Sequence, residues 1–115
     1  MRGLLIDVIN REVHKVQVSQ LSDYYKAMHC ETISTIAASL NGINITIICD
    51  EDALCHENPI PCIFDTTGSI VVWNSVIIAG FDPNAEDFVD LPDYAEKEIR
   101  KRIVHMKDET PCLQL

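Results

Sequence analysis

The sequence contains no apolar run that is long enough to cross a lipid bilayer. Its longest runs, Ile43 to Cys49 and Ile70 to Gly80, are far shorter than the roughly 20 residues that a transmembrane helix needs. The first residues also lack the basic start, apolar centre and small-residue cleavage site of a secretory signal. We therefore expect a cytoplasmic protein that makes no contact with a membrane.

Basic residues are scarce as well. Lysine and arginine together number 9 against 18 aspartates and glutamates, which gives a formal net charge of −9. Nucleic acids and anionic membranes attract Lys and Arg, so we expect neither to be a direct partner. The acidity has two remaining explanations, namely solubility or an approach to a basic protein surface.

Motifs of common catalytic chemistry are absent. There is no glycine-rich phosphate loop, no nucleophile elbow and no His-Glu-x-x-His sequence. Cys49, Cys55, His56 and Cys62 do not have the spacing of zinc ligands, and the adjacent Cys55 and His56 do not form an oriented nucleophile–base pair. The five cysteines are expected to be reduced thiols. We therefore expect no enzyme, no cofactor and no metal.

The residues that are present indicate an ordinary globular domain. The chain has 115 residues, of which 47% are hydrophobic, and this length fits one domain with its own core. Alternating apolar residues predict two hairpins. The first joins Leu4 to Ile9 and Val13 to Val18, and the second joins Glu31 to Leu40 and Ile43 to Cys49 through Asn41-Gly42.

Two helices and further strands complete the expected domain. A short helix should place Leu21, Tyr24, Tyr25 and Met28 on one core-facing side. Asp93 can cap the N-terminus of a final helix. The remaining expected segments are strands at Cys62 to Phe64 and Ile70 to Gly80, an acidic surface loop from Asp82 to Pro92, and the final helix from Tyr94 to Lys107.

This order of elements predicts an α+β fold. We expect a mostly antiparallel sheet built from hairpins, with one short helix after the first hairpin, a C-terminal helix, and both helices against one face. Residues 1–107 should form the single domain. Residues 108–115 should form a loose C-terminal tail, in which Leu113 and Leu115 could dock on a partner.

The main candidate site is the acidic segment after the second hairpin. Asp50, Glu51 and Asp52 stand at a strand end, where carboxylates could accept hydrogen bonds from ribose hydroxyls or an amino group, or hold a hard cation. They could equally cap the helical turn that follows. Trp73 could stack on a base and Asn74 could read its edge, or Trp73 could anchor the core. The candidate ligand-binding residues are Glu31, Asp50, Glu51, Asn58, Trp73 and Asn74.

The same residues carry a resemblance to a known family. Cys49 to Leu54, then Asn58-Pro59, then Val72 to Gly80 resemble domain of unknown function 3846, a family of small phage and plasmid proteins. Residues 2–80 are similar to it, whereas the C-terminal helix and tail lie outside. Asn74 stands where many members have Gly or Asn, while Pro61 and Cys62 depart from the usual spacing. The resemblance implies a mobile genetic element in a bacterial host cytoplasm, where small accessory proteins commonly act against host defence.

Three functions are compatible with these observations. The chain could bind and sequester a small nucleotide-type signal of the host, with its basic residues contacting the phosphates; these are Lys15, Arg100, Lys101 and Arg102. It could instead cover the basic, nucleic-acid-binding surface of a host defence protein. An enzyme that uses Glu31 with Asp50, Glu51 or Asp52 is the third possibility. Open strand edges also make a homo-oligomer reasonable.

Overall fold

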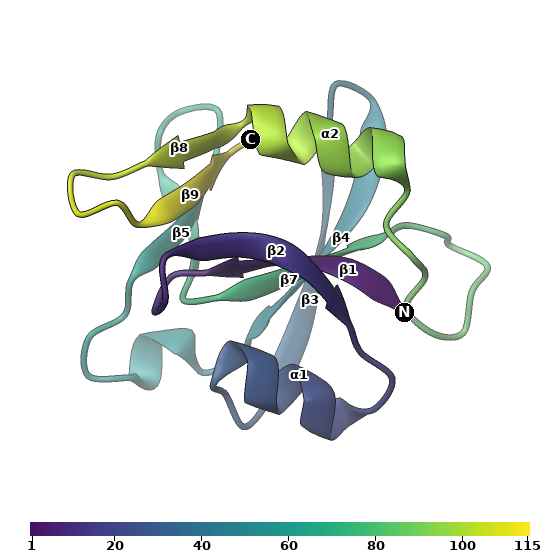
Figure 1. The fold of residues 1–115 in the computed structure, drawn as a ribbon, viewed down its shortest axis with the longest axis horizontal. Coiled ribbons are helices and arrows are strands. Elements are labelled where there is room, and N and C mark those ends of the chain that lie inside the picture. The colour runs from purple at the N-terminus through teal and green to yellow at the C-terminus, as the bar shows by residue number, and fades with distance from the viewer.

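A computed structural model describes residues 1–115 (Figure 1). The chain forms two α-helices, one short 3-10 helix (η1) and nine strands. In chain order they are β1 (Arg2–Asp7), β2 (Glu12–Gln17), α1 (Leu21–Met28), β3 (Ile33–Leu40), β4 (Ile43–Asp50), η1 (Ala53–Cys55), β5 (Pro61–Phe64), β6 (Ile70–Trp73), β7 (Val76–Gly80), α2 (Asp93–Lys101), β8 (Ile103–His105) and β9 (Pro111–Gln114).

Both expected hairpins are confirmed, and their turns explain why. Arg11 in the first turn and Asn41 and Gly42 in the second have positive φ angles, of 60°, 50° and 79° respectively. Two successive positive φ angles match the right-handed twist of the flanking strands, and Asn-Gly tolerates them well. The second hairpin is the longer one, and it pairs Ile33 with Asp50 at its open end.

The strands form two sheets where one was expected. The first sheet has the order β2-β1-β7-β4-β3 and is antiparallel throughout. The second sheet has the order β6-β5-β9-β8, in which β5 and β9 run parallel. The expected α+β class with mostly antiparallel pairing is therefore confirmed.

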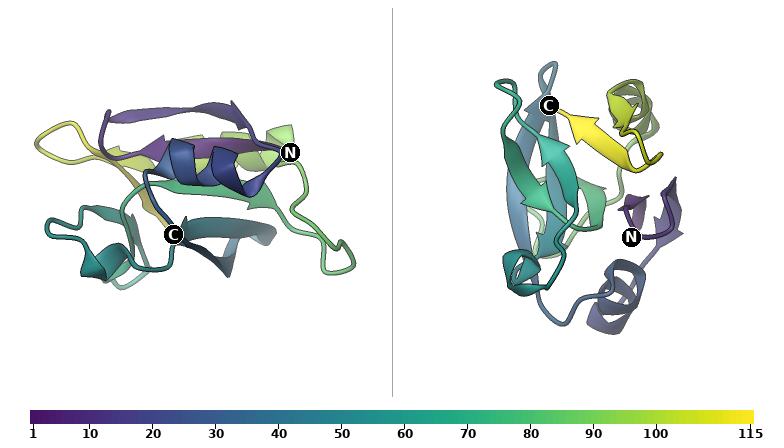
Figure 2. Two further views of the ribbon diagram at one scale, coloured as in Figure 1. Left: turned by 90° about the horizontal axis from the view of Figure 1, so that it is seen from below. Right: turned by 90° about the vertical axis from the view of Figure 1, so that its left-hand side faces the viewer.

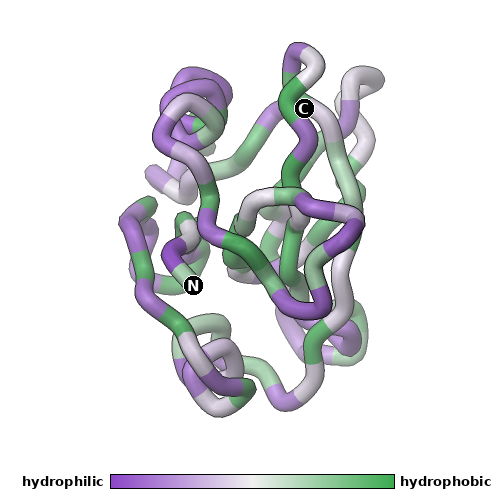
Figure 3. Tube along the Cα trace, turned by 90° about the vertical axis from the view of Figure 1, so that its right-hand side faces the viewer, coloured by the Kyte–Doolittle hydropathy of each residue, from purple (hydrophilic) through white to green (hydrophobic).

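The first sheet is buried on both faces by two separate clusters. One face packs against the second sheet and α2, and this cluster contains Ile45, Ile47 and Ile99. The other face packs against α1, with Ile48 and Ile77 in that cluster. The hydrophobic colour in Figure 3 accordingly gathers on the inner strands, whereas α2, at the upper left, is mostly hydrophilic.

The two helices consequently lie on opposite faces, and the expectation of one shared face was wrong. Figures 1 and 2 show α1 and α2 on opposite sides of the strands β1 and β7. The reason is that β7 is apolar on both faces and β4 adds Ile48 to the face opposite Ile45 and Ile47, so each face needs its own cover. In α1, Tyr24 and Met28 are buried as expected, but Leu21 is 56% exposed because it begins the helix beyond the sheet.

Two other expected elements are shorter than predicted. The strand expected from Ile70 to Gly80 is broken at Asn74, whose φ of 67° turns the chain between β6 and β7. The final helix begins as expected near Asp93 but ends at Lys101, and Ile103 starts a strand instead. Neither helix has the length and apolar character that crossing a bilayer requires.

The expectation of a loose tail was also wrong. Pro111 to Gln114 form β9, which lies between β5 and β8, and Cys112 and Leu113 are fully buried. Leu113 joins the main core, so it docks on its own chain and not on a partner. Pro111 is compatible with this strand because it stands at its first residue.

Candidate functional site

A pocket opens where the end of α1 meets the segment after β4. It encloses about 360 Å³. Its lining is polar and comes from these two segments only: Tyr25, His29, Cys30 and Glu31 on one side, and Asp50, Asp52, Cys55 and His56 on the other. Figure 1 shows α1 and η1 as neighbours at the same end of the molecule. The sequence-predicted Glu31 and Asp50 are therefore brought together.

Asp50 is the buried anchor of this pocket. Only 3% of its side chain is exposed. One carboxylate oxygen accepts a hydrogen bond from the backbone N–H of Asp52 at 2.9 Å, and the other lies 2.7 Å from Nε2 of His56. The Asp50 carboxylate thus fixes both the turn that follows β4 and the orientation of the His56 ring, whose side chain is 48% exposed.

Asp52 is positioned by a side-chain hydrogen bond, and His29 is positioned by its backbone conformation. The Asp52 carboxylate accepts a hydrogen bond from the Thr32 hydroxyl at 2.9 Å, which ties the loop to the start of β3. His29 ends α1 in the left-handed conformation, with a φ of 54°. That conformation terminates the helix and turns the chain toward Cys30 and Glu31. The hydrogen bond between Thr32 and Asp52 and the turn at His29 therefore hold the two segments that line the pocket.

The Cys30 thiol in this pocket is a poor nucleophile. Burial, together with the nearby Asp50 carboxylate, raises the pKa of Cys30 to about 11. The thiol is protonated at neutral pH, whereas the thiolate is the reactive form. The side chains of the pocket also do not converge as a set of three or more metal ligands.

An apolar groove lies on the other side of the same loop. It encloses about 190 Å³, and Ile36, Leu54, Val71 and Trp73 contribute to its lining. Asp50 and Glu51 also border it, so the acidic segment separates the groove from the polar pocket. Trp73 and Glu51 therefore border the groove and not the pocket.

Asn74 makes structural hydrogen bonds and borders neither cavity, and its binding of a ligand stays a prediction. Its side-chain oxygen accepts a hydrogen bond from the Ile60 backbone N–H at 2.9 Å, and its amide nitrogen donates to the Ala53 carbonyl at 3.5 Å. Its positive φ explains why Gly or Asn suits this position. Asn58 is exposed and borders neither cavity.

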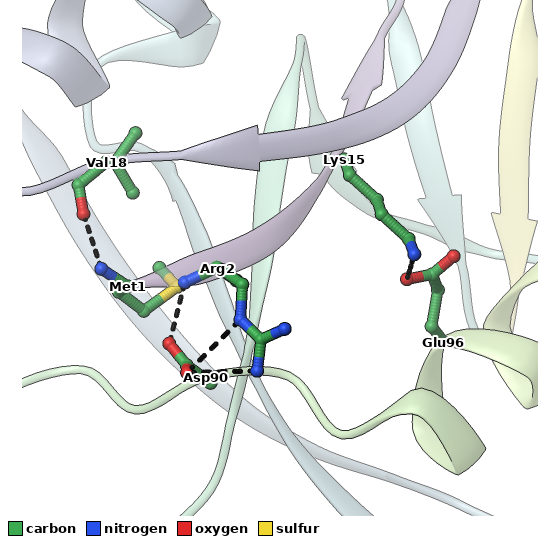
Figure 4. Close-up of polar contacts among 6 residues, drawn as sticks. All are labelled: Met1, Arg2, Lys15, Val18, Asp90 and Glu96. Atoms are coloured by element: carbon green, nitrogen blue, oxygen red, sulfur yellow. Dashed lines mark hydrogen bonds and ion pairs between the residues drawn. The ribbon is translucent and has the colours of Figure 1, made fainter.

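The basic residues that we expected to contact phosphates are not in the pocket. Lys15 lies 3.7 Å from Glu96 of α2, and Figure 4 shows this pair beside the Arg2–Asp90 pair. Arg100 pairs with Glu96, and Arg102 pairs with Glu98. α2 lies on the opposite face of the first sheet from α1. The expected phosphate contacts are therefore wrong for this pocket.

Sequence reasoning missed four residues of the pocket, namely Tyr25, His29, Cys30 and His56. His56 was considered only as a metal ligand or as a base for Cys55, although its partner is Asp50, and Tyr25 was considered only as a core residue. His29 was not considered as part of a site. A usable signal was present, because a carboxylate at a strand end and a histidine after one helical turn can meet across that turn. The approach of α1 to the segment after β4 had no such signal in the sequence.

These features define a small α+β domain with two packed sheets and a polar pocket at one end. The profile of the family described as Domain of unknown function (DUF3846) matches residues 1–104. The chain belongs to this family. The match includes α2 and β8, so the family resemblance extends beyond the residues 2–80 that we identified. No curated protein and no solved structure gave a significant match.

Proposed function

We propose that this chain binds and sequesters a small nucleotide-type signal in the polar pocket. The observation that carries the proposal is the Asp50–His56 pair, which is fixed at 2.7 Å and borders a pocket of about 360 Å³. A buried carboxylate that orients a half-exposed histidine creates a preorganised hydrogen-bonding group. A pocket with a few such groups is typical of small-molecule sites.

The chemistry of the lining selects one part of such a signal. Glu31 and Asp52 supply acceptor oxygens, and Tyr25 supplies an aromatic ring with a hydroxyl. These groups suit ribose hydroxyls, a base amino group and a base π-face. No Lys or Arg lines the pocket, so phosphates should remain outside it. We therefore propose that the nucleoside portion enters and the phosphates face solvent.

Calorimetry with nucleosides, nucleotides and cyclic oligonucleotides tests this proposal. The wild type should bind at least one of them, and Glu31→Gln and Asp52→Ala should each weaken the affinity at least tenfold. Glu31→Gln should leave Tm unchanged, whereas Asp52→Ala should lower Tm slightly because it also loses the hydrogen bond from Thr32. Glu98→Gln, at the far end of the molecule, is the matched control and should bind normally. Native mass spectrometry of protein from its bacterial host should show a co-purifying small molecule. The proposal fails if none of the compounds binds and no bound molecule is released.

The phage or mobile-element setting and the bacterial cytoplasm are part of this proposal. They rest on the family resemblance alone, and a small protein that binds a signal without converting it acts by depletion. Depletion requires the protein to match its ligand in number, so the stoichiometry from the same calorimetry is informative. A ratio near one ligand per pocket supports sequestration.

The acidic loop supports a second function, a protein-binding inhibitor. Asp82, Glu86 and Asp87 are exposed next to Phe81, which is 42% exposed. Acidic side chains around an exposed aromatic ring fit a basic protein surface. Charge reversal of these three residues should abolish capture of a host protein and reduce its salt dependence. Asp90, which pairs with Arg2, should matter less.

A further inference from the structure

The four open sheet edges of this protein differ in how well they are protected. β2 and β3 end the first sheet, and β6 and β8 end the second. β6 and β8 have only 4 and 3 residues, and β2 carries Glu12, His14 and Lys15. Short length and charge are the usual means of preventing edge pairing. These three edges are therefore protected.

β3 has neither kind of protection. It has 8 residues, with no charged residue and no proline. The uncharged segment extends from Thr32 through β4 to Cys49 in a chain whose net charge is −9. Four of its residues, Thr35, Ile36, Ala37 and Ser39, are exposed, and Ile36 is 40% exposed. A long, uncharged edge of this kind is a template for another strand.

The backbone pattern shows which groups are available. The Glu51 N–H donates to the Thr32 carbonyl, and these two residues continue the register that pairs Ile33 with Asp50. In an antiparallel ladder, bonded residues alternate. The even-numbered residues of β3 therefore bond to β4, and the N–H and C=O groups of the odd-numbered residues point to the open edge. These residues are Ile33, Thr35, Ala37 and Ser39.

We propose that β3 pairs with β3 of a second copy to form a two-fold symmetric dimer. The outward residues are arranged symmetrically about Ile36. An antiparallel pairing centred there places Ile33 opposite Ser39 of the partner subunit and Thr35 opposite Ala37 of the partner subunit, so every outward backbone group gains a partner. The two first sheets then join into one continuous sheet.

The charge distribution favours a second copy as the occupant. Two chains of net charge −9 repel each other, so contact between two copies costs least at an uncharged surface such as β3. In the centred register, the nearest carboxylate, Glu31, faces Asn41 of the partner subunit, and no two acidic residues are opposed. Ile36 meets Ile36 of the partner subunit at the axis, on the side of the apolar groove. A basic protein partner would be drawn to the acidic surfaces instead.

Cross-linking tests both the dimer and its register. In a Cys55→Ser background, which removes the exposed native thiol, Ile36→Cys places two cysteines opposite each other in a non-hydrogen-bonded pair. Their Cα atoms should lie about 4.5 Å apart, within disulfide range. Mild oxidation should convert most of the protein to a covalent dimer. Ala38→Cys is the matched control, because its two copies should be about 13 Å apart along the strands and should not cross-link.

Solution mass provides the independent measurement. Light scattering and native mass spectrometry should give the wild type twice the mass of one chain. Ala37→Pro removes one outward N–H and leaves the bonds to β4 intact, so it should give a folded monomer, with folding checked by circular dichroism. A wild type that stays monomeric at every concentration overturns the proposal. A host peptide that pairs with β3 in place of a second copy also overturns it. Equal cross-linking of the two cysteine variants also overturns it.

Discussion

The two ends of the molecule treat their acidic side chains differently. At the α2 end, Glu96 lies near both Lys15 and Arg100, and Glu98 pairs with Arg102. At the pocket end, no Lys or Arg lies within ion-pair distance of an acidic residue, and Asp50 is instead hydrogen-bonded to the His56 ring. The net charge of −9 is thus distributed unevenly.

This difference separates acidic residues that support the fold from those that are available to a ligand. The carboxylates near α2 already have basic partners, and the contribution of these pairs to stability is small because at least one partner of each pair remains partly exposed to solvent. Glu31 and Asp52 at the pocket end keep free acceptor capacity. The comparison therefore predicts that mutations at the α2 end change the free energy of unfolding slightly. Mutations at the pocket end should change stability or ligand binding strongly.

The largest expected effect is that of Asp50→Ala. Removing the buried carboxylate leaves the Asp52 N–H and the His56 ring without their acceptor. The free energy of unfolding should fall by about 3 kcal/mol, measured by urea denaturation. Asp50→Asn keeps an acceptor oxygen and should lose less. If Asp50→Ala lowers the free energy of unfolding no more than the loss of an ion pair at the α2 end does, the comparison of the two ends is wrong.

The next effect concerns Asn74, which anchors the segment between β4 and β5. Asn74→Ala loses two side-chain hydrogen bonds and places a non-glycine residue without polar compensation at positive φ. It should destabilise the protein by about 2 kcal/mol. Asn74→Gly keeps the backbone conformation and should cost about 1 kcal/mol. Equal costs for the two variants would show that the left-handed conformation is unimportant here.

A smaller effect, dependent on pH, is expected at Asp7. Burial raises the pKa of this carboxyl, but the hydrogen bonds from Asn10 and Ile9 and the nearby His29 together hold the pKa below its ordinary value. A lowered folded-state pKa stabilises the protein above the unfolded pKa of about 3.9, and that stabilisation is lost as the pH falls through the folded pKa.

Asp7→Asn tests this effect. Denaturation at neutral pH should show the variant to be less stable by about 1 kcal/mol, and the difference should shrink below about pH 4. A stability difference that stays constant from neutral to acidic pH would mean that ionisation of Asp7 has no part in it.

The smallest effect is expected at Glu98. Glu98→Gln weakens the pair with Arg102 at 3.2 Å but keeps an acceptor for the Asn41 side chain. The change in the free energy of unfolding should be at most about 0.5 kcal/mol and should diminish in high salt. A loss of more than 1 kcal/mol would place a structurally critical acid at the α2 end and would weaken the contrast.

Local signals in the sequence predicted much of the fold. The Asn41-Gly42 turn and the alternating isoleucines of β4 were sufficient for the second hairpin, since turn chemistry and side-chain period agree there. The two-sheet arrangement had no local signal. β9 is only 4 residues long, and its burial depends on contact with β5, some 50 residues earlier in the chain. Such pairing cannot be read from periodicity.

The candidate site was predicted in part for the same reason. Asp50 was predicted because a carboxylate directly follows an apolar strand, and this local pattern holds. Its pairing with His56 and the approach of α1 depend on the tertiary fold. Asn74 was placed among the ligand-binding candidates because the sequence does not show that its φ is positive, and this backbone conformation gives a second reason for its identity.

The position of β9 has a consequence for how this protein is made on the ribosome. The strands of the first sheet are all synthesised by Gly80, whereas β9 occupies an inner position of the second sheet and is completed only at Gln114. During translation, the first sheet can therefore assemble while the face that the second sheet will cover is still open to solvent. Nascent chains halted between these two points would expose that apolar face and would need chaperone protection until the last strand emerges.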